Sequence, residues 1–292
     1  MIRFSHTNFT FILTLSCPNR PGIVAAISKK LFDIGGNITE AQQFDYTEGG
    51  QFFMRIVFDI PKSETIQNSI EAEMAPLSET FKMEWTLTNM DKPQKVLILV
   101  SKFDHCLVDL LYRWRIGELA IEPVGIISNH PLETYKDIEF YGVPFHHLPI
   151  TKDTKAEQEA RIWDIFEKSG AELAILARYM QILSNEFSAK LSGKCINIHH
   201  SFLPGFKGAR PYHQAFERGV KLIGATAHYV TRDLDEGPII EQDVERISHA
   251  DTPDDLIRKG RDIERRVLAR AVRSHIERRS LINGKKTIVF ND

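Results

Sequence analysis

Up to Met90, the spacing of hydrophobic side chains switches between a period of two, typical of strands, and a helical period of about 3.6 residues. In chain order, the predicted elements are a strand at Phe9–Cys17, a helix from Ile23 to Leu31, strands at Ile38–Tyr46 and Gln51–Ile60, a helix after Ser63 and a strand at Met83–Thr88. The loop between the two middle strands has glycines at its tip, as a hairpin requires. This βαββαβ order predicts a ferredoxin-like unit.

The polar, proline-containing stretch Met90–Pro93 predicts a junction between two domains, residues 1–90 and 91–292. After it, the continuous apolar run Val96–Val100 is typical of a strand buried on both faces. Helical and strand-like segments then alternate, at Leu107–Trp114, Pro123–Ser128, Thr154–Ser169 and Leu173–Ala177. This alternation predicts an α/β domain with a doubly wound, mostly parallel sheet, whose site lies at the carboxyl ends of the strands.

Charge along the chain argues against a nucleic-acid partner. The 292 residues carry 37 Lys plus Arg against 39 Asp plus Glu, a formal net charge of -2, which lacks the basic excess that non-specific binding to nucleic acid requires. Many arginines do gather on one side of an amphipathic helical pattern at Pro253–Arg279. We interpret them as a solvated face or an oligomer contact, in preference to the alternative of an anion-binding role.

The cysteines and the lengths of the apolar runs indicate the compartment. Cys17, Cys106 and Cys195 are far apart and odd in number, which supports neither a disulfide framework nor a CxxC zinc site. No apolar run approaches the ~18 residues of a membrane span, and the stretch Phe9–Ser16 is not followed by the cleavage site of a secretory signal. We therefore expect a cytoplasmic protein with no membrane partner.

The stretches Cys195–Pro204 and Thr231–Pro238 carry the candidate chemistry. Because apolar and polar residues alternate around Asn197 and His199, both polar side chains project from the same side of a strand end. Histidine is suited to moving a proton near neutral pH, and an amide NH2 beside it can donate to an oxyanion. Asp235 would complete the set by holding the imidazole, provided that it lies close by, which spacing alone does not show.

Other chemistries are less well supported by the same residues. The pairs His146-His147 and His199-His200 are adjacent in sequence, so on a strand their side chains point to opposite faces and do not form a natural chelate. Ser201 lacks the GxSxG elbow of a serine hydrolase. We therefore predict no metal and no cofactor. The alternative for either His199 or His200 is a structural histidine with satisfied hydrogen bonds.

The segments Asn197-Ile-His199, Ser201–Pro204 and Leu234–Pro238 resemble the folate-dependent formyltransferase family. The resemblance implies that Asn197 holds the oxyanion, His199 transfers the proton and Asp235 orients His199. It also implies a loop that receives the pterin ring of the substrate and a second loop that closes over the other edge of the ring. The residues of these loops are Met180, Gln181, Ile182 and Leu183 in the first and Val230 and Asp233 in the second.

The acceptor of the formyl group is indicated by the turn Ser101–Leu107. Glycinamide ribonucleotide formyltransferases of the family carry a glycine-rich turn here, whose backbone N–H groups cradle a phosphate. This chain has no glycine in that turn and has an acidic Asp104, and no added basic domain would serve a tRNA acceptor. Water is then the simplest acceptor. The alternatives are formyl transfer to an amine and a non-enzymatic folate or amino-acid sensor.

The segments Cys17–Ile23 and Gly35–Ile38 resemble an ACT domain, a βαββαβ module that binds amino acids. An ACT domain before a formyltransferase-like domain resembles the deformylases of the family. The resemblance implies hydrolysis of 10-formyltetrahydrofolate to tetrahydrofolate and formate, which would supply purine biosynthesis and balance one-carbon pools. It also implies a homo-oligomer and an amino-acid effector, glycine or methionine, near Asn19, Gly22 and Asn37. A purely structural or dimerising unit is the alternative.

Overall fold

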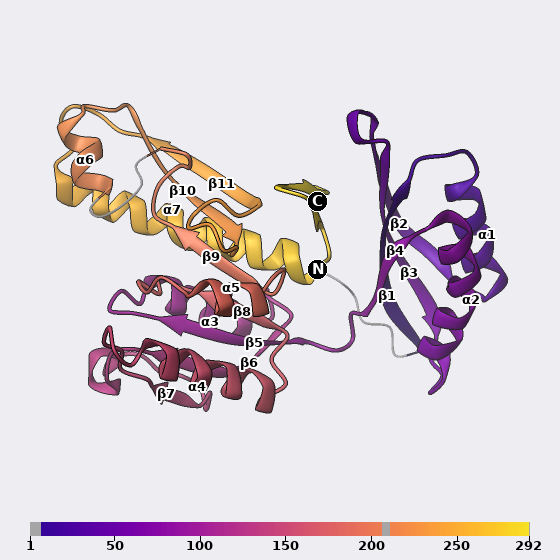
Figure 1. Cartoon of the computed structure of the whole chain (residues 1–292), viewed down its shortest axis with the longest axis horizontal. Coiled ribbons are helices and arrows are strands. Elements are labelled where there is room, and N and C mark those ends of the chain that lie inside the picture. Colours follow the sequence, from indigo (N-terminus) through magenta and orange to yellow (C-terminus); the bar gives the residue numbers. More distant parts are fainter. Residues whose placement is uncertain (1–6, 206–210, 292) are drawn as a thin grey trace. The chain divides into compact units, whose positions relative to one another are not determined.

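The computed structural model describes residues 7–205 and 211–291, which form two compact units (Figure 1). One unit takes in the chain up to Pro93 together with Glu277–Arg279 and the residues from Phe290 onward. The other consists of Gln94–Ile276 and Ser280–Val289. The boundary expected after residue 90 lies close to this one. The expected division did not assign the C-terminal segments to the first unit, because segments this short show no hydrophobic periodicity.

The first unit is a four-stranded antiparallel sheet packed against two helices. Its elements are β1 (Asn8–Pro18), α1 (Ile23–Asp33), β2 (Asn37–Tyr46), the 3-10 turn Thr47–Gly49, β3 (Gln51–Pro61), α2 (Ile66–Phe81) and β4 (Glu84–Asn89). The strand order is β2-β3-β1-β4. Alternate residues of β1 such as Leu13 share one apolar core with Ile27 of α1 and Met74 of α2. The predicted ferredoxin-like unit is confirmed.

The second unit is built on a seven-stranded sheet in the order β11-β10-β9-β8-β5-β6-β7. Its elements are β5 (Gln94–Val100), α3 (His105–Arg115), β6 (Ile121–Ser128), the 3-10 turn Leu132–Tyr135, β7 (Phe145–His147), α4 (Lys155–Lys168), β8 (Leu173–Leu176), α5 (Asn185–Lys190), β9 (Cys195–His199), α6 (Pro211–Glu217), β10 (Leu222–Tyr229), β11 (Ile239–Arg246), α7 (Pro253–Ile276) and the hairpin strands β12 (Ser280–Asn283) and β13 (Lys286–Val289). The strands β9, β8, β5, β6 and β7, which are neighbours in this order, run parallel, whereas β10 is antiparallel to both of its neighbours.

Helices cover both faces of this sheet, and β5 shows why (Figure 1). Its even-numbered residues, among them Ile98, share a core with apolar residues of α3 and α7. Its odd-numbered residues Leu97 and Leu99 belong to a second core with residues of α4 and α5. A strand buried on both faces must be apolar throughout, which explains the continuous run in the sequence. The doubly wound, mostly parallel sheet is confirmed.

The strand order reverses beside β5, and this reversal positions the site. The chain moves from β5 outward to β6 and β7, and then crosses to β8 on the other side of β5. In open α/β sheets, ligands bind outside the carboxyl ends of the strands at such a switch point. The segments that leave β5, β8 and β9 at this edge therefore form the expected site region.

Helix α7 ends at Ile276, earlier than the expected Arg279. Arg278 has a left-handed backbone (φ 52°), which interrupts the helix, and Glu277–Arg279 joins the first unit. Among the described residues, no helix combines the length and the apolar character that a membrane crossing needs.

Candidate active site

Asn197 and His199 project from the same face of β9, at the carboxyl end of the strand. Because β9 is hydrogen-bonded to β8 on one side and to β10 on the other, both side chains stand on a strand held along both edges. His228 of β10 lies opposite Asn197 in the register. The amide Nδ2 of Asn197 is 3.2 Å from Nε2 of His228.

His228 sets the direction of the Asn197 amide. Its Nδ1 is 2.9 Å from the backbone carbonyl of Tyr229, which can only accept, so Nδ1 carries a proton. In the neutral imidazole, Nε2 then accepts from the NH2 group of Asn197 and leaves the second N–H of that group for a ligand. Sequence reasoning missed His228 as a site residue, although a histidine inside the apolar strand β10 is a signal of a buried polar contact.

Asp235 lies beside His199, as the site hypothesis requires. Its Oδ1 is 3.3 Å from Nδ1 of His199 and 3.7 Å from Nε2 of His228. Burial alone would raise the pKa of Asp235, but the hydrogen bond from His199 Nδ1 and the proximity of His228 outweigh it and hold the pKa well below its usual range. An ionised Asp235 favours the Nδ1–H form of His199. The Nε2 of His199 is buried and has no hydrogen-bond partner among the described residues, so its lone pair is open to a ligand.

Gly237 allows the loop that carries Asp235 to fold back against β10. A Cβ at this position would lie 1.7 Å from the carbonyl oxygen of Tyr229, closer than any side chain tolerates. The backbone N–H of Tyr229 donates to the carbonyl of Pro238 at 2.9 Å, which fixes the loop end. Asp235 itself has a left-handed backbone (φ 57°), a conformation that aspartate adopts more readily than most residues. The Asp-Glu-Gly-Pro sequence is therefore what brings the carboxylate to the histidine.

His200 does not take part in proton transfer near neutral pH. Burial, and the nearby charge of Arg178, lower its pKa to about 3, so the imidazole is neutral. The ring centroids of His199 and His200 are 5.2 Å apart. Of the two adjacent histidines, only His199 touches the carboxylate that a catalytic imidazole needs.

A cavity of about 310 Å³ adjoins these groups. All residues that the sequence assigned to catalysis and substrate binding line it, namely Asn197, His199, Asp235, Met180, Gln181, Ile182, Leu183, Val230 and Asp233. The structure brings the two predicted loops and the polar triple together around one space. Its size falls within the range of small-ligand pockets.

The loop at the cavity wall is anchored to the end of β5. The backbone N–H of Met180 donates to Oγ of Ser101 at 3.0 Å, and that hydroxyl donates to Oδ1 of Asn129 at 2.6 Å. Met180 and Ile182 are 51% and 61% exposed, although both are large and apolar. Exposed apolar side chains beside a cavity are suited to covering a flat apolar ligand.

The predicted regulatory residues are not brought together within one chain. Asn19 follows the end of β1, where Pro18 pairs with Gln51 at the start of β3. Asn37 pairs with Asp59 near the other end of β3. The two ends are separated by roughly 26 Å of strand at about 3.3 Å per residue. Gly22, with φ 95°, lies at the start of α1 and so on the same side as Asn19.

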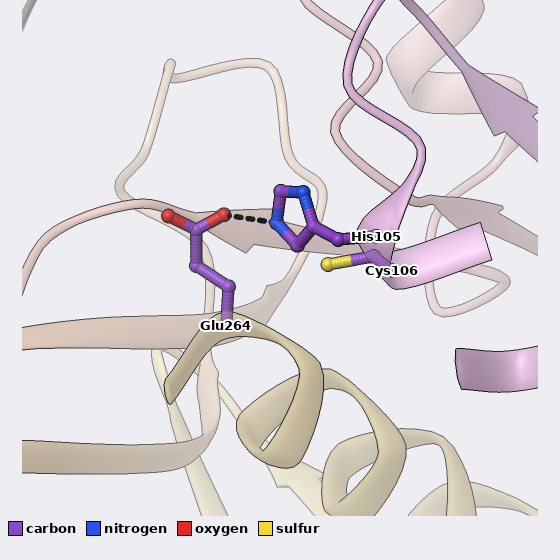
Figure 2. A group of neighbouring side chains, drawn as sticks. All are labelled: His105, Cys106 and Glu264. Carbon is purple, nitrogen blue, oxygen red and sulfur yellow. Dashed lines mark hydrogen bonds and ion pairs between the residues drawn. The ribbon is translucent and has the colours of Figure 1, made fainter. Parts of the chain in front are cut away.

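One further cluster contains residue types that can bind a metal: His105, Cys106 and Glu264 (Figure 2). Glu264 already accepts from His105 Nε2 at 2.8 Å and from the Tyr212 hydroxyl at 2.5 Å, and Arg178 Nε is 3.2 Å away. Burial and the Glu264 charge raise the pKa of Cys106 well above its usual value, so it stays a thiol. Hydrogen bonds from His105 and Tyr212 already engage both oxygens of Glu264, and the nearby Arg178 charge further disfavours a metal ion at this cluster.

The fold and the site define the second unit as a formyl transferase domain. The Formyl transferase family model matches residues 94–272, and the ACT domain model matches residues 11–73. The chain is 48% identical to formyltetrahydrofolate deformylase of Corynebacterium sp. (strain P-1) over 96% of this chain and 97% of that protein. It is 49% identical to the Bacillus subtilis protein of the same name, over 96% of this chain and 93% of that protein. The chain belongs to the formyltetrahydrofolate deformylase family.

Solved structures agree with this assignment. The crystal structure of formyltetrahydrofolate deformylase from Burkholderia mallei matches with a TM-score of 0.90 and 53% identity, covering 97% of this chain and 100% of that chain. Glycinamide ribonucleotide transformylase 1 from Symbiobacterium toebii matches with a TM-score of 0.63 and 28% identity, over 70% of this chain and 98% of that chain. The predicted resemblance to the formyltransferase family and to its deformylases is confirmed.

Proposed function

We propose that this chain hydrolyses 10-formyltetrahydrofolate to tetrahydrofolate and formate. The observation that carries the proposal is the convergence of Asn197, His199 and Asp235 on one cavity, with the Nε2 of His199 unpartnered among the described residues. An oriented base and an amide donor side by side are the groups that acyl transfer to water needs. The names of the relatives point to the same reaction.

In the first step, Nε2 of His199 takes a proton from water while the water oxygen bonds to the formyl carbon. The π electrons of the carbonyl move onto its oxygen, and the free N–H of Asn197 donates to this oxyanion. His199 becomes an imidazolium, which the ionised Asp235 at 3.3 Å stabilises. The donors stand ready before the charge develops, because β9, β10 and the Gly237 loop hold them in place.

In the second step, the oxyanion reforms the carbonyl and the bond between the formyl carbon and the folate nitrogen breaks. His199 returns its proton to that nitrogen, which leaves as the amine of tetrahydrofolate. Formic acid loses its proton to solvent, and the enzyme returns to its starting state. Protein side chains supply every group in this scheme, so we propose that the reaction uses neither a metal nor a cofactor.

The proposal is tested by measuring formate and tetrahydrofolate released from 10-formyltetrahydrofolate, in buffer alone and with glycinamide ribonucleotide added. We expect turnover in buffer alone that an Asp235→Ala variant loses, because His199 then has no anion to orient it or stabilise its charge. Turnover that requires the amine would instead identify a transferase. Circular dichroism of the variant provides the control for folding.

We also propose that an amino acid, glycine or methionine, binds the first unit in a homo-oligomer. Because Asn19 and Asn37 lie at opposite ends of the sheet, one site would take Asn19 from one copy and Asn37 from another. Mixing Asn19→Ala and Asn37→Ala chains should then restore binding to half of the sites in the mixed oligomer, measured by calorimetry. No restoration on mixing would show that each site lies within one chain.

The proposed cellular setting is the cytoplasm, where the released formate would supply purine biosynthesis. Cys17, Cys106 and Cys195 are buried and free of disulfides, as is usual in a reducing compartment. We expect neither a nucleic-acid nor a membrane partner. Fractionation of the source cells followed by an immunoblot checks the compartment.

A further inference from the structure

A second cavity, of about 250 Å³, adjoins the active-site cavity and has no role in the scheme above. Arg178, Met180 and His200 line both cavities. The second cavity is also lined by Arg261 and Glu264 of α7 and by residues at the start of α3. A small product released beside His199 therefore lies next to the shared wall.

Arg178 is the unusual residue of the shared wall. It is only 7% exposed, yet its Nη1 has no hydrogen-bond partner among the described residues. Its Nε is 3.2 Å from the carboxylate of Glu264 but also makes no aligned hydrogen bond. The backbone of Arg178 is left-handed (φ 64°), and its carbonyl accepts from the N–H of Ser101 at 3.2 Å. A strained backbone and a buried donor without a hydrogen bond both raise the free energy of the folded state. Such features are found at sites where a ligand supplies the missing hydrogen bond.

Glu264, the carboxylate that lines the second cavity, already has hydrogen-bond partners. It is 1% exposed and accepts a hydrogen bond from His105 (Figure 2) and another from the hydroxyl of Tyr212. Burial would raise the pKa of Glu264, but the hydrogen bond from His105 and the charge of Arg178 outweigh it, so the group is ionised. The Glu264 carboxylate therefore already accepts hydrogen bonds from the protein and does not require a ligand as a partner.

Among the described residues, the guanidinium and carboxylate charges that face the cavity leave a positive excess. Two guanidiniums, Arg178 and Arg261, face one carboxylate, Glu264. Both guanidiniums lie near the Phe103 ring, with their Cζ atoms 5.7 and 5.9 Å from its centroid. His105 is the first residue of α3, so the positive end of that helix faces the same space. One excess positive charge matches a monoanion, whereas a dianion would place a second negative charge beside Glu264.

We propose that this second cavity binds a small monocarboxylate through Arg178 and Arg261, and that its ligand during turnover is the product formate. The inference rests on the proposed hydrolysis, because that reaction releases formate next to the shared wall. Formate would accept from Nη1 of Arg178 and so complete the hydrogen bonds of the buried guanidinium. The site would separate the two products, holding formate away from His199 while tetrahydrofolate leaves.

The test is a titration of the full-length protein with [13C]formate, followed by the NMR line width of the formate carbon. A ligand of this size binds at best near ~1 mM, which line broadening detects. In Arg178→Lys, which keeps the charge but loses Nη1, we expect the Kd to rise about tenfold or more. In Arg261→Gln we expect a rise of about threefold, because that side chain is exposed and its charge is screened.

Arg258→Gln is the matched control, since Arg258 lies on the same helix, pairs with Asp255 and has a 70% exposed side chain. Binding with wild-type affinity in the control and weakened binding in both test variants would support the site. No saturable binding, equal binding in all variants, or tighter binding of inorganic phosphate through the same residues would overturn it. If Arg178→Lys fails to fold, the Arg261→Gln comparison still decides.

The same titration separates this inference from the proposed function. It needs no turnover, so formate binding can be present in a protein that does not hydrolyse the folate. Hydrolysis without saturable formate binding would reject the second site alone. Formate binding without hydrolysis would reject the proposed function and the identification of formate as its product.

Discussion

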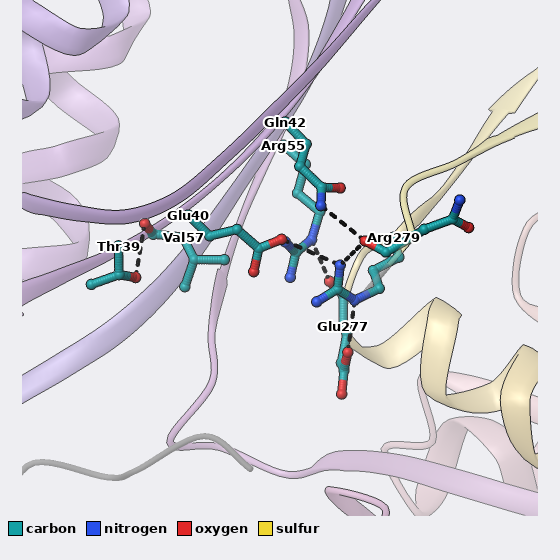
Figure 3. A network of polar contacts seen from close by, with 8 residues as sticks. Thr39, Glu40, Gln42, Arg55, Val57, Glu277 and Arg279 are labelled. Carbon is teal, nitrogen blue, oxygen red and sulfur yellow. Dashed lines mark hydrogen bonds and ion pairs between the residues drawn. The ribbon is translucent and has the colours of Figure 1, made fainter.

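Two buried arginines, one in each unit, have opposite surroundings. Arg55 of β3 is 1% exposed, and its Nε and Nη1 donate to the carbonyl of Glu277 at 2.9 Å and to Glu40 at 2.6 Å (Figure 3). Arg178 is 7% exposed, but its Nη1 has no partner in the part of the chain that the structure describes. Buried donors are normally satisfied, so the first arginine is a structural contact and the second belongs to a site that takes a ligand.

The hydrogen-bond networks around the two arginines differ in the same way. In the first unit, Glu40 also accepts from Arg279 at 3.2 Å, and Arg279 binds Glu277 at 2.9 Å, so the network closes on the returning C-terminal segment (Figure 3). At the site in the second unit, Nη1 of Arg178 and Nε2 of His199 are buried and have no hydrogen-bond partner among the described residues. Damage to the closed network should lower stability and spare turnover, whereas loss of a donor that faces the substrate at the open site should lower turnover with little effect on stability.

The largest expected effect is at the open site. Asn197→Ala removes the donor to the oxyanion, and the loss of one such donor costs about 100- to 1000-fold in kcat. The side chain contacts only His228 among the hydrogen bonds of the structure, so we expect the free energy of unfolding to change by less than about 1 kcal/mol. Steady-state kinetics and urea unfolding on the same preparation check both values. Near-normal turnover would show that Asn197 is not the oxyanion donor.

At the closed network, Glu40→Ala should lower the free energy of unfolding by about 3 kcal/mol. The variant leaves the Arg55 guanidinium, whose side chain is 2% exposed, without its carboxylate and facing Arg279. Burial and the Arg279 charge already lower the pKa of Arg55, so the loss of Glu40 removes its main compensation. Denaturant unfolding measures the change, and kcat of the folded fraction should equal that of the wild type.

The control for this variant is Glu73→Ala. Glu73 pairs with Lys30 in the same unit, but both side chains are partly exposed, at 48% and 29%. Exposed pairs contribute about 0 to 1 kcal/mol, so a similar loss of stability in both variants would contradict the distinction between a closed buried network and a surface pair.

The ionised Asp235 makes the stability of the protein depend on pH. Its pKa in the folded protein lies well below the value of about 3.9 in the unfolded chain. Between these two values the unfolded state binds more protons, so stability rises with pH. The contribution is complete above about pH 5 and is lost as the pH falls below about 4.

The measurement is urea unfolding of the wild type and Asp235→Asn from pH 7 to pH 3. The stability difference between them should stay constant down to about pH 5 and shrink below about pH 4. Asp243 also has a lowered pKa, but it is present in both proteins and cancels in the difference. A difference that does not depend on pH would mean that Asp235 is not ionised against His199 in the folded state.

Sequence reasoning succeeded where a local pattern determines the structure. The period of two around Asn197 and His199 places both on one face of β9, and the apolar run in β5 follows from helices on both faces of the sheet. The position of Asp235 could be expected only from the family resemblance. In physical terms it depends on Gly237, whose missing side chain lets a loop pack on β10, and no local pattern reveals that contact.

Local sequence patterns could not predict the second cavity. Arg178, His105 and Glu264 come from separate segments, which meet only at the switch point of the sheet. Each leaves a weak signal: Arg178 is a charge directly after a buried strand, and Glu264 lies between Ile263 and Val267 on the apolar stripe of α7. A charge on an apolar stripe indicates a buried partner, but the sequence does not say which one.

The smallest expected effect is the stabilisation of the folded protein by formate, which should depend on Arg178 and not on Arg55. Formate at ten times its Kd should raise the free energy of unfolding by about 1.4 kcal/mol if it binds only the folded state. Thermal unfolding in sodium formate, compared with sodium chloride at equal ionic strength, separates binding from screening. Glu73→Ala should gain as much from formate as the wild type does, because it leaves Arg178 unchanged and keeps the hydrogen bonds that occupy Arg55. Arg178→Lys should gain much less, and an equal gain in all three proteins would mean that formate acts as a general salt and that the open donor of Arg178 is not its site.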